Sequence, residues 1–185
     1  MKFWIPLAAT VALGLLYPYF RLIIKRLRCM KKIKELCRAK GYRMYETGAL
    51  RILCSNRSKK CDLYIETENE IFAIKLFGVL KRRRTLILKE NRDYIIRSYI
   101  VILSYVARLC FPIDRKPGRM PKYDFEYKLK DEWKKKPLRR VLLINPVCTG
   151  MIYSSESGYR AGLAGDSFCG MTVHTASSFI ELIKE

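Results

Sequence analysis

The sequence has few of the residues and motifs on which common catalytic sites depend. His174 is the only histidine, and no CxxC pair and no GxxxxGK[ST], GxGxxG or GxSxG motif occurs. Zinc-finger, nucleotide-binding and serine-hydrolase sites therefore have no support. A Ser-His or Cys-His pair would have to use His174. Because His174 lies on an apolar stretch beside Thr175, we predict a packed structural histidine instead.

Paired cysteine spacing is also missing, although the chain has seven cysteines. An odd, scattered set is typical of reduced and mostly buried thiols, which fits a cytosolic domain. The alternative is a metal site or disulfide at Cys54 and Cys61, which lie close in sequence at predicted strand edges. The full set is Cys29, Cys37, Cys54, Cys61, Cys110, Cys148 and Cys169.

Acidic residues are scarce. The 17 Asp and Glu residues face 37 Lys and Arg residues, which gives a formal net charge of +20. Half of the 185 residues are apolar, so the chain is not a disordered basic tail. The positive charge predicts an anionic partner, which is either nucleic acid or an acidic membrane surface.

The N-terminal segment lacks charge almost completely. Phe3–Phe20 contains no charged residue, and apolar residues continue past Arg21. A helix of this length can cross about 30 Å of hydrocarbon. Lys2 alone precedes the apolar run, whereas basic residues crowd after it, so the positive-inside rule places the rest of the chain in the cytoplasm. We predict a transmembrane anchor at 1–25 with its N-terminus outside the cell membrane; a cleaved signal peptide is the alternative.

Residues 26–185 are predicted to form one α/β domain with a mixed sheet. Residues 94–109 suit either a buried helix or strands, because helical spacing and β-branched content disagree. Residues 111–140 are charged and contain four prolines, so we predict a long connection. The predicted helices cover 27–40, about 125–134 and a C-terminal segment capped by Ser178 and Glu181, and the predicted strands cover 42–45, 49–54, 85–89, 141–144 and 168–174.

A β-hairpin over 61–78 is the centre of this prediction. Apolar residues alternate along two arms, and Glu68 and Asn69 suit the turn. One face then carries the natural core residues, and the other face places Asp62 directly opposite Lys75. An opposite-charge cross-strand pair is common in any sheet, where it contributes about 0.2–1 kcal/mol. The core-side residues are Leu63, Ile65, Phe72, Ile74 and Leu76.

The order of these elements resembles a PD-(D/E)XK nuclease core, with the Mrr-type restriction endonuclease domain as the most similar branch. The resemblance rests on a basic helix ending at Lys40-Gly41-Tyr42, then Asp62, then Ala73-Ile74-Lys75, then the buried strand 141–144. It implies a restriction-endonuclease-like fold. It also implies that two acids hold Mg²⁺ and that the lysine orients or activates the attacking water.

One member of the implied catalytic set is missing, because Ala73 occupies the position of the second acid. A methyl group cannot bind a metal. Glu66 lies on the same hairpin face, diagonal to Ala73, and is the alternative second ligand. Glu70 points to the opposite face and is a poorer substitute. The implied catalytic residues are therefore Asp62, Glu66 and Lys75, with Asp62 and Glu66 as metal ligands, and the departure at Ala73 favours a degenerate domain that needs no cofactor.

Two basic runs supply the expected contacts to nucleic acid. The first follows the hairpin, and the second lies before the buried strand. We expect a membrane-anchored, cytoplasmic, nuclease-like domain that contacts nucleic acid without cleaving it. The alternatives are a true Mg²⁺-dependent nuclease, or a scaffold whose basic face meets anionic lipid. The basic residues are Lys81, Arg82, Arg83 and Arg84 in the first run and Lys134, Lys135, Lys136, Arg139 and Arg140 in the second.

Overall fold

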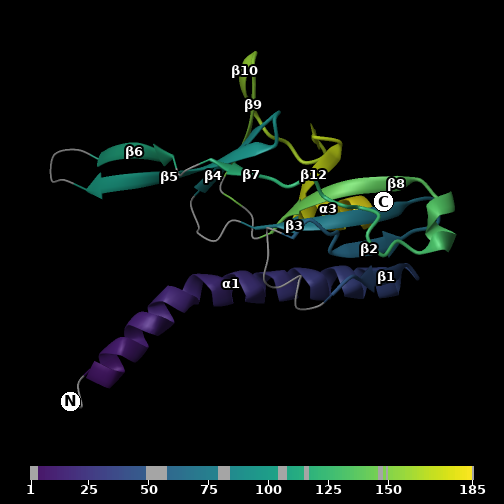
Figure 1. Ribbon diagram of the computed structural model, residues 1–185, viewed down its shortest axis with the longest axis horizontal. Coiled ribbons are helices and arrows are strands. Elements are labelled where there is room, and N and C mark those ends of the chain that lie inside the picture. Colours follow the sequence, from purple (N-terminus) through teal and green to yellow (C-terminus); the bar gives the residue numbers. More distant parts are fainter. Residues whose placement is uncertain are drawn as a thin grey trace.

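The computed structural model describes residues 4–48, 58–78, 84–103, 108–114, 117–145, 148 and 150–184. These residues form two mixed sheets with helices, which confirms the α/β class. The predicted strand 49–54 and the basic residues Lys81, Arg82 and Arg83 lie outside the described residues. Figure 1 shows the two sheets beside each other, with α1 beneath the first of them.

The first sheet contains the predicted hairpin at its centre. Its strands run in the order β1-β2-β3-β8-β12-β11. The pairs β1–β2 and β2–β3 are antiparallel, β3–β8 and β8–β12 are parallel, and β11 closes the edge antiparallel to β12. The bounds are β1 Arg43–Glu46, β2 Leu63–Glu66, β3 Ile71–Phe77, β8 Leu138–Ile144, β11 Ser167–Phe168 and β12 Met171–Thr175.

Two helices cover one face of this sheet. They are α1, Trp4–Ala39, and α3, Ala176–Lys184. Apolar residues at helical spacing on α1 pack with Phe179 against the core side of the hairpin, as the alternation predicted. Figure 1 shows α1 running along the sheet and continuing beyond it toward the N-terminus. Among the described residues, no helix is both long enough and apolar enough for a membrane crossing.

The opposite face of the first sheet is covered by the segment between β6 and β8. This segment contains β7, Gly118–Arg119, and the 3₁₀ helix η1, Asp131–Lys135. Its aromatic residues Tyr123, Phe125 and Trp133 join one buried cluster with Tyr64 and Ala73 of the hairpin. The predicted connection therefore exists, but it is a packed layer. The helix expected at about 125–134 is reduced to η1.

Within 94–109, the described residues 94–103 and 108–109 lie in strands of the second sheet. Its main order is β10-β9-β4-β5-β6, and β7 pairs with β5. Figure 1 shows β5 and β6 extending away from the remaining strands. The bounds are β4 Arg84–Lys89, β5 Asp93–Leu103, β6 Arg108–Asp114, β9 Gly150–Ser155 and β10 Gly158–Ala161.

The C-terminal helix begins earlier than predicted. Thr175, rather than Ser178, is the capping residue, and the two form reciprocal bonds: the Ser178 N–H donates to Thr175 Oγ1 at 3.2 Å and the Thr175 N–H donates to Ser178 Oγ at 3.0 Å. This is a capping box in which serine replaces the usual Glu or Gln. The predicted strand 168–174 is divided into β11 and β12 by a turn at Cys169 and Gly170, both at positive φ.

Candidate functional site

The register of the central hairpin is the predicted one. Leu63 pairs with Ile74 and Glu66 pairs with Ile71. The turn is closed by the Thr67 N–H, which donates to the Glu70 carbonyl oxygen at 3.0 Å. Asp62 precedes β2 and continues the pairing, because its N–H donates to the Ile74 carbonyl oxygen at 3.0 Å. Asp62 therefore faces Lys75 across the hairpin.

Asp62 and Lys75 form a close ion pair with further backbone bonds. The Lys75 ammonium lies 2.9 Å from each carboxylate oxygen of Asp62. Asp62 Oδ2 also accepts the Leu76 N–H at 2.9 Å, and the ammonium donates to the Lys60 carbonyl oxygen at 3.0 Å. Each charge is thus held by several short hydrogen bonds, which is the condition for a stable buried ion pair.

This pair is sealed from solvent. The side chains of Lys75 and Asp62 are 0% and 2% exposed. The Tyr123 ring lies 5.6 Å from the ammonium, and the covering segment is tied down nearby by the Cys61 N–H, which donates to the Asp124 carbonyl oxygen at 3.0 Å. Burial raises the pKa of Asp62 and lowers that of Lys75, and the attraction within the pair opposes both shifts.

Glu66, the third member of the implied catalytic set, lies elsewhere. It is four residues from Asp62 along the chain, about 13 Å at 3.3 Å per strand residue. Its carboxylate accepts the Trp133 indole N–H at 2.8 Å and the Lys136 ammonium at 2.9 Å. The Lys136 bond is the main cause of a lowered Glu66 pKa. The structure therefore brings Asp62 and Lys75 together without Glu66, and within the described ranges no group of three His, Cys, Asp or Glu residues could hold a metal ion.

The second basic run is largely paired with acids. Lys134 bonds Asp131 at 2.7 Å, and Lys136 bonds Glu66 at 2.9 Å. Arg139 contacts Glu70 at 3.5 Å. Lys135 and Arg140 are exposed, whereas Arg84 of the first run is buried in β4. Three of the five positive charges of this run are therefore neutralised by acidic residues of the same protein.

His174, Cys29, Cys37 and Cys61 behave as packed residues, whereas Cys148 is half-buried and Cys169 is exposed. His174 is buried beside Phe179, with ring centroids 6.0 Å apart, and neither ring nitrogen has a hydrogen-bond partner among the described residues. Burial lowers the His174 pKa, and Arg139 lowers it further. Burial raises the pKa of Cys29 and Cys37 to about 11, so these thiols stay protonated and unreactive near neutral pH.

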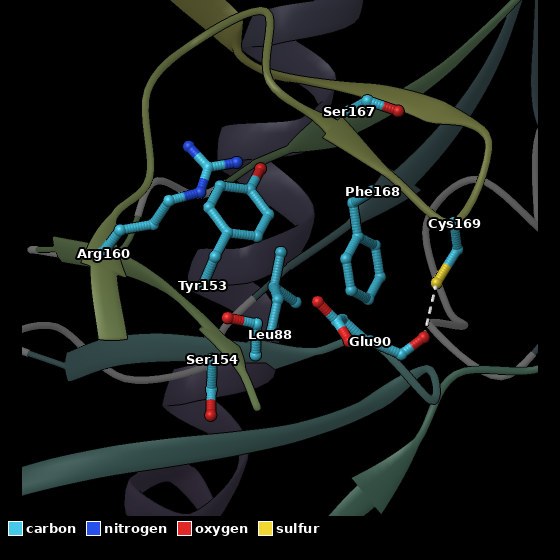
Figure 2. Close-up of a pocket in the computed structure, with 9 residues that line it drawn as sticks. Leu88, Glu90, Tyr153, Ser154, Arg160, Ser167, Phe168 and Cys169 are labelled. Atoms are coloured by element: carbon cyan, nitrogen blue, oxygen red, sulfur yellow. Dashed lines mark hydrogen bonds between the residues drawn. The ribbon is translucent and has the colours of Figure 1, made fainter. Parts of the chain in front are cut away.

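Sequence reasoning missed two hollows that form only on folding. The first, of about 180 Å³, lies between β4, β9, β10 and β11. Figure 2 shows the Arg160 side chain beside the Tyr153 ring, with its guanidinium 4.7 Å from the ring centroid. The Cys169 thiol donates to the Glu90 carbonyl oxygen at 3.4 Å (Figure 2). The residues that line this hollow come from separate parts of the chain, so no local sequence pattern predicts it.

The second hollow, of about 80 Å³, is lined by the covering segment, by Arg140 of β8 and by residues around the β11–β12 turn. Tyr123, whose ring covers Lys75, and Phe125 contribute its aromatic wall. Arg92, Lys122 and Arg140 also line it, and none of these three forms an ion pair with a described residue. Tyr123 and Phe125 are buried, so the hollow offers three cations to phosphate groups and no open ring for base stacking.

No protein-family model, curated protein or solved structure matches this chain. The restriction-endonuclease-like core therefore stays a prediction, and its function has to be argued from the contacts described above.

Proposed function

We propose that this chain is a membrane-attached, restriction-endonuclease-like domain that contacts nucleic acid without cleaving it. In this proposal the domain lies in the cytoplasm and the N-terminus lies outside. The order of elements supports the fold, since the helix α1, the hairpin with Asp62 and Lys75, and the parallel strand β8 follow one another as the resemblance requires. The uncharged run Phe3–Phe20 supports the membrane attachment.

The observation that carries nucleic-acid contact is the basic hollow lined by Arg92, Lys122 and Arg140. Arg92, Lys122 and Arg140 come from three separate parts of the chain and line one hollow together. Their charges have no balancing acid in the described structure, so release of counterions from a polyphosphate would favour binding. The overall charge of +20 acts in the same direction.

The absence of cleavage is argued from the sealed pair. A metal-dependent nuclease needs at least two oxygen ligands for Mg²⁺ beside an accessible phosphate. Here Ala73 stands in place of the second acid and is fully buried, and Lys75 is committed to Asp62 and to a backbone carbonyl. A phosphate could reach this pair only after the covering segment had moved away.

The test uses the full chain in nanodiscs of zwitterionic lipid, titrated with duplex DNA between about 50 and 200 mM salt. We expect binding that weakens steeply with salt. The variant Arg92→Gln/Lys122→Gln/Arg140→Gln should reduce the salt slope by about 2.7, at about 0.9 per phosphate contact. The matched control Lys31→Gln/Lys32→Gln/Lys34→Gln removes the same charge from α1, on the opposite face of the first sheet, and should leave the slope unchanged.

Two results would overturn the proposal. Absence of binding at low salt would remove nucleic acid as the partner, and equal losses in both triple variants would remove the hollow as the site. Adding Mg²⁺ or Mn²⁺ should produce no strand cleavage. Cleavage that Asp62→Asn abolishes would instead favour the active-nuclease alternative, which the close approach of Asp62 and Lys75 still supports.

A further inference from the structure

One side of α1 is exposed along the length of the described side chains, and its character changes abruptly. Before Arg28 the exposed large side chains are apolar, with exposed fractions between 47% and 65%. From Arg28 onward the exposed side chains on this side are basic, with Glu35 as the one acid between them. The apolar members are Leu16, Tyr17, Phe20, Ile24 and Leu27, and the basic members are Arg28, Lys31, Lys32, Lys34 and Arg38; Tyr19 is also exposed but lies on the other side of α1.

These residues share one side because of helical geometry. At about 100° per residue, Tyr17, Ile24, Arg28 and Lys31 lie within about 60° of one another around the helix axis. The buried residues of α1, such as Ile33 and Cys37, lie on the opposite side against the first sheet. We call the exposed set from Leu16 to Arg38 the outer stripe of α1.

We propose that the outer stripe of α1 lies against an anionic membrane surface, so that the domain meets the lipid through α1. In this orientation the apolar half of the stripe is the cytoplasmic end of the membrane-crossing segment, and the basic half that follows contacts acidic headgroups. The hollow formed by Arg92, Lys122 and Arg140 lies across the first sheet and would face away from the lipid, where nucleic acid can approach. The inference rests on the membrane attachment proposed above.

Lipid fits the stripe better than nucleic acid does. A polyphosphate would pair with the basic half but would leave Tyr17, Phe20 and Ile24 exposed to water. A membrane satisfies both halves, because the apolar half is continuous with the uncharged run toward the N-terminus. Lys31 contacts Glu35 at only 3.9 Å between exposed groups, so most of the basic charge remains available to a partner.

The test is amine labelling of the full chain in nanodiscs, followed by mass spectrometry, with Lys32 as the reporter. Phosphatidylserine-containing discs are compared with purely zwitterionic discs. We expect Lys32 to be protected in the anionic discs, and we expect high salt to reverse the protection. Each basic residue near an anionic surface raises the equilibrium constant for the lipid-facing orientation by about fivefold. The triple variant Lys31→Gln/Lys34→Gln/Arg38→Gln should therefore lower this constant by about a hundredfold.

The control variant is Lys59→Gln/Arg119→Gln/Lys128→Gln, which removes three exposed charges outside α1. It should leave the protection of Lys32 intact. Equal labelling of Lys32 in both kinds of disc, with the chain still disc-bound, would overturn this inference while the membrane attachment stands. A chain that does not associate with discs would overturn both. Protection of Lys32 by duplex DNA in zwitterionic discs, but not by acidic lipid, would assign the stripe to nucleic acid.

Discussion

Replacing Lys75 with methionine removes the ammonium and keeps the side-chain volume close to that of lysine. The Asp62 carboxylate would then be left buried, with the Leu76 N–H as a remaining donor and the buried Arg26 as a remaining nearby cation. Breaking a buried pair from one side costs about 3–5 kcal/mol. Since domains of this size are stable by only about 5–15 kcal/mol, Lys75→Met should lose a large part of the free energy of unfolding.

The double variant Asp62→Leu/Lys75→Met isolates the contribution of the ion pair to the free energy of unfolding. It removes both charges together and leaves the Leu76 N–H and the Lys60 carbonyl oxygen without their side-chain partners. An unsatisfied buried group costs about 1–3 kcal/mol, so the double variant should be much less destabilised than the sum of the two single variants. Asp62→Leu alone completes the cycle.

Urea unfolding of the full chain in mild detergent measures these differences, followed by the fluorescence of buried Trp133 in a Trp4→Phe background. A catalytic residue commonly destabilises the folded protein, so replacing it is neutral or stabilising. If Lys75→Met costs less than about 1 kcal/mol, or stabilises the protein, the description of the pair as a structural element is wrong.

Two further predictions follow from the pKa shifts at His174 and Glu66. Because burial and then Arg139 lower the His174 pKa, the unfolded chain takes up a proton that the folded chain does not. The urea concentration at the unfolding midpoint should therefore fall as the pH is lowered from about 7 to about 5.5, and His174→Phe should flatten this pH dependence. If the variant shows the same pH dependence, His174 is not its cause. Glu66→Gln should cost about 1–3 kcal/mol, because it removes the negative charge to which Lys136 and Trp133 donate, and should leave DNA binding unchanged. Since the Glu66 pKa is lowered, this difference is present above about pH 4.3 and should disappear as the pH falls through the folded-state pKa; a difference that persists at lower pH would point to another cause.

The hairpin could be predicted from sequence because its determinants are local. The alternation of apolar residues and the short turn after Glu66 fix the register, so Asp62 and Lys75 face each other as expected. Burial of the same pair could not be predicted, because Tyr123 reaches it from a segment about 50 residues away. The distance of Glu66 from Asp62 follows from strand rise alone, but its partners Trp133 and Lys136 come from the covering segment and could not be predicted.

The ambiguity at 94–109 had a different cause. Ile, Val and Tyr recur there at a spacing that satisfies both periods, and only pairing with β4 and with β6 decides in favour of strands. The outer stripe of α1 could have been found from periodicity, but its exposure depends on which face the first sheet occupies. Both hollows depend on distant segments and were beyond sequence reasoning.

Amine labelling of Lys75 tests the central claim most directly. With 0% of its side chain exposed, Lys75 should react only through unfolding or opening of the covering segment, far more slowly than exposed Lys59 and Lys122 in the same sample. Duplex DNA bound at the hollow should at most slow this modification further, because binding disfavours opening of the covering segment. If Lys75 reacts as fast as the surface lysines and DNA protects it, Asp62 and Lys75 lie in an open cleft. That result would contradict the sealed pair and favour an active nuclease site.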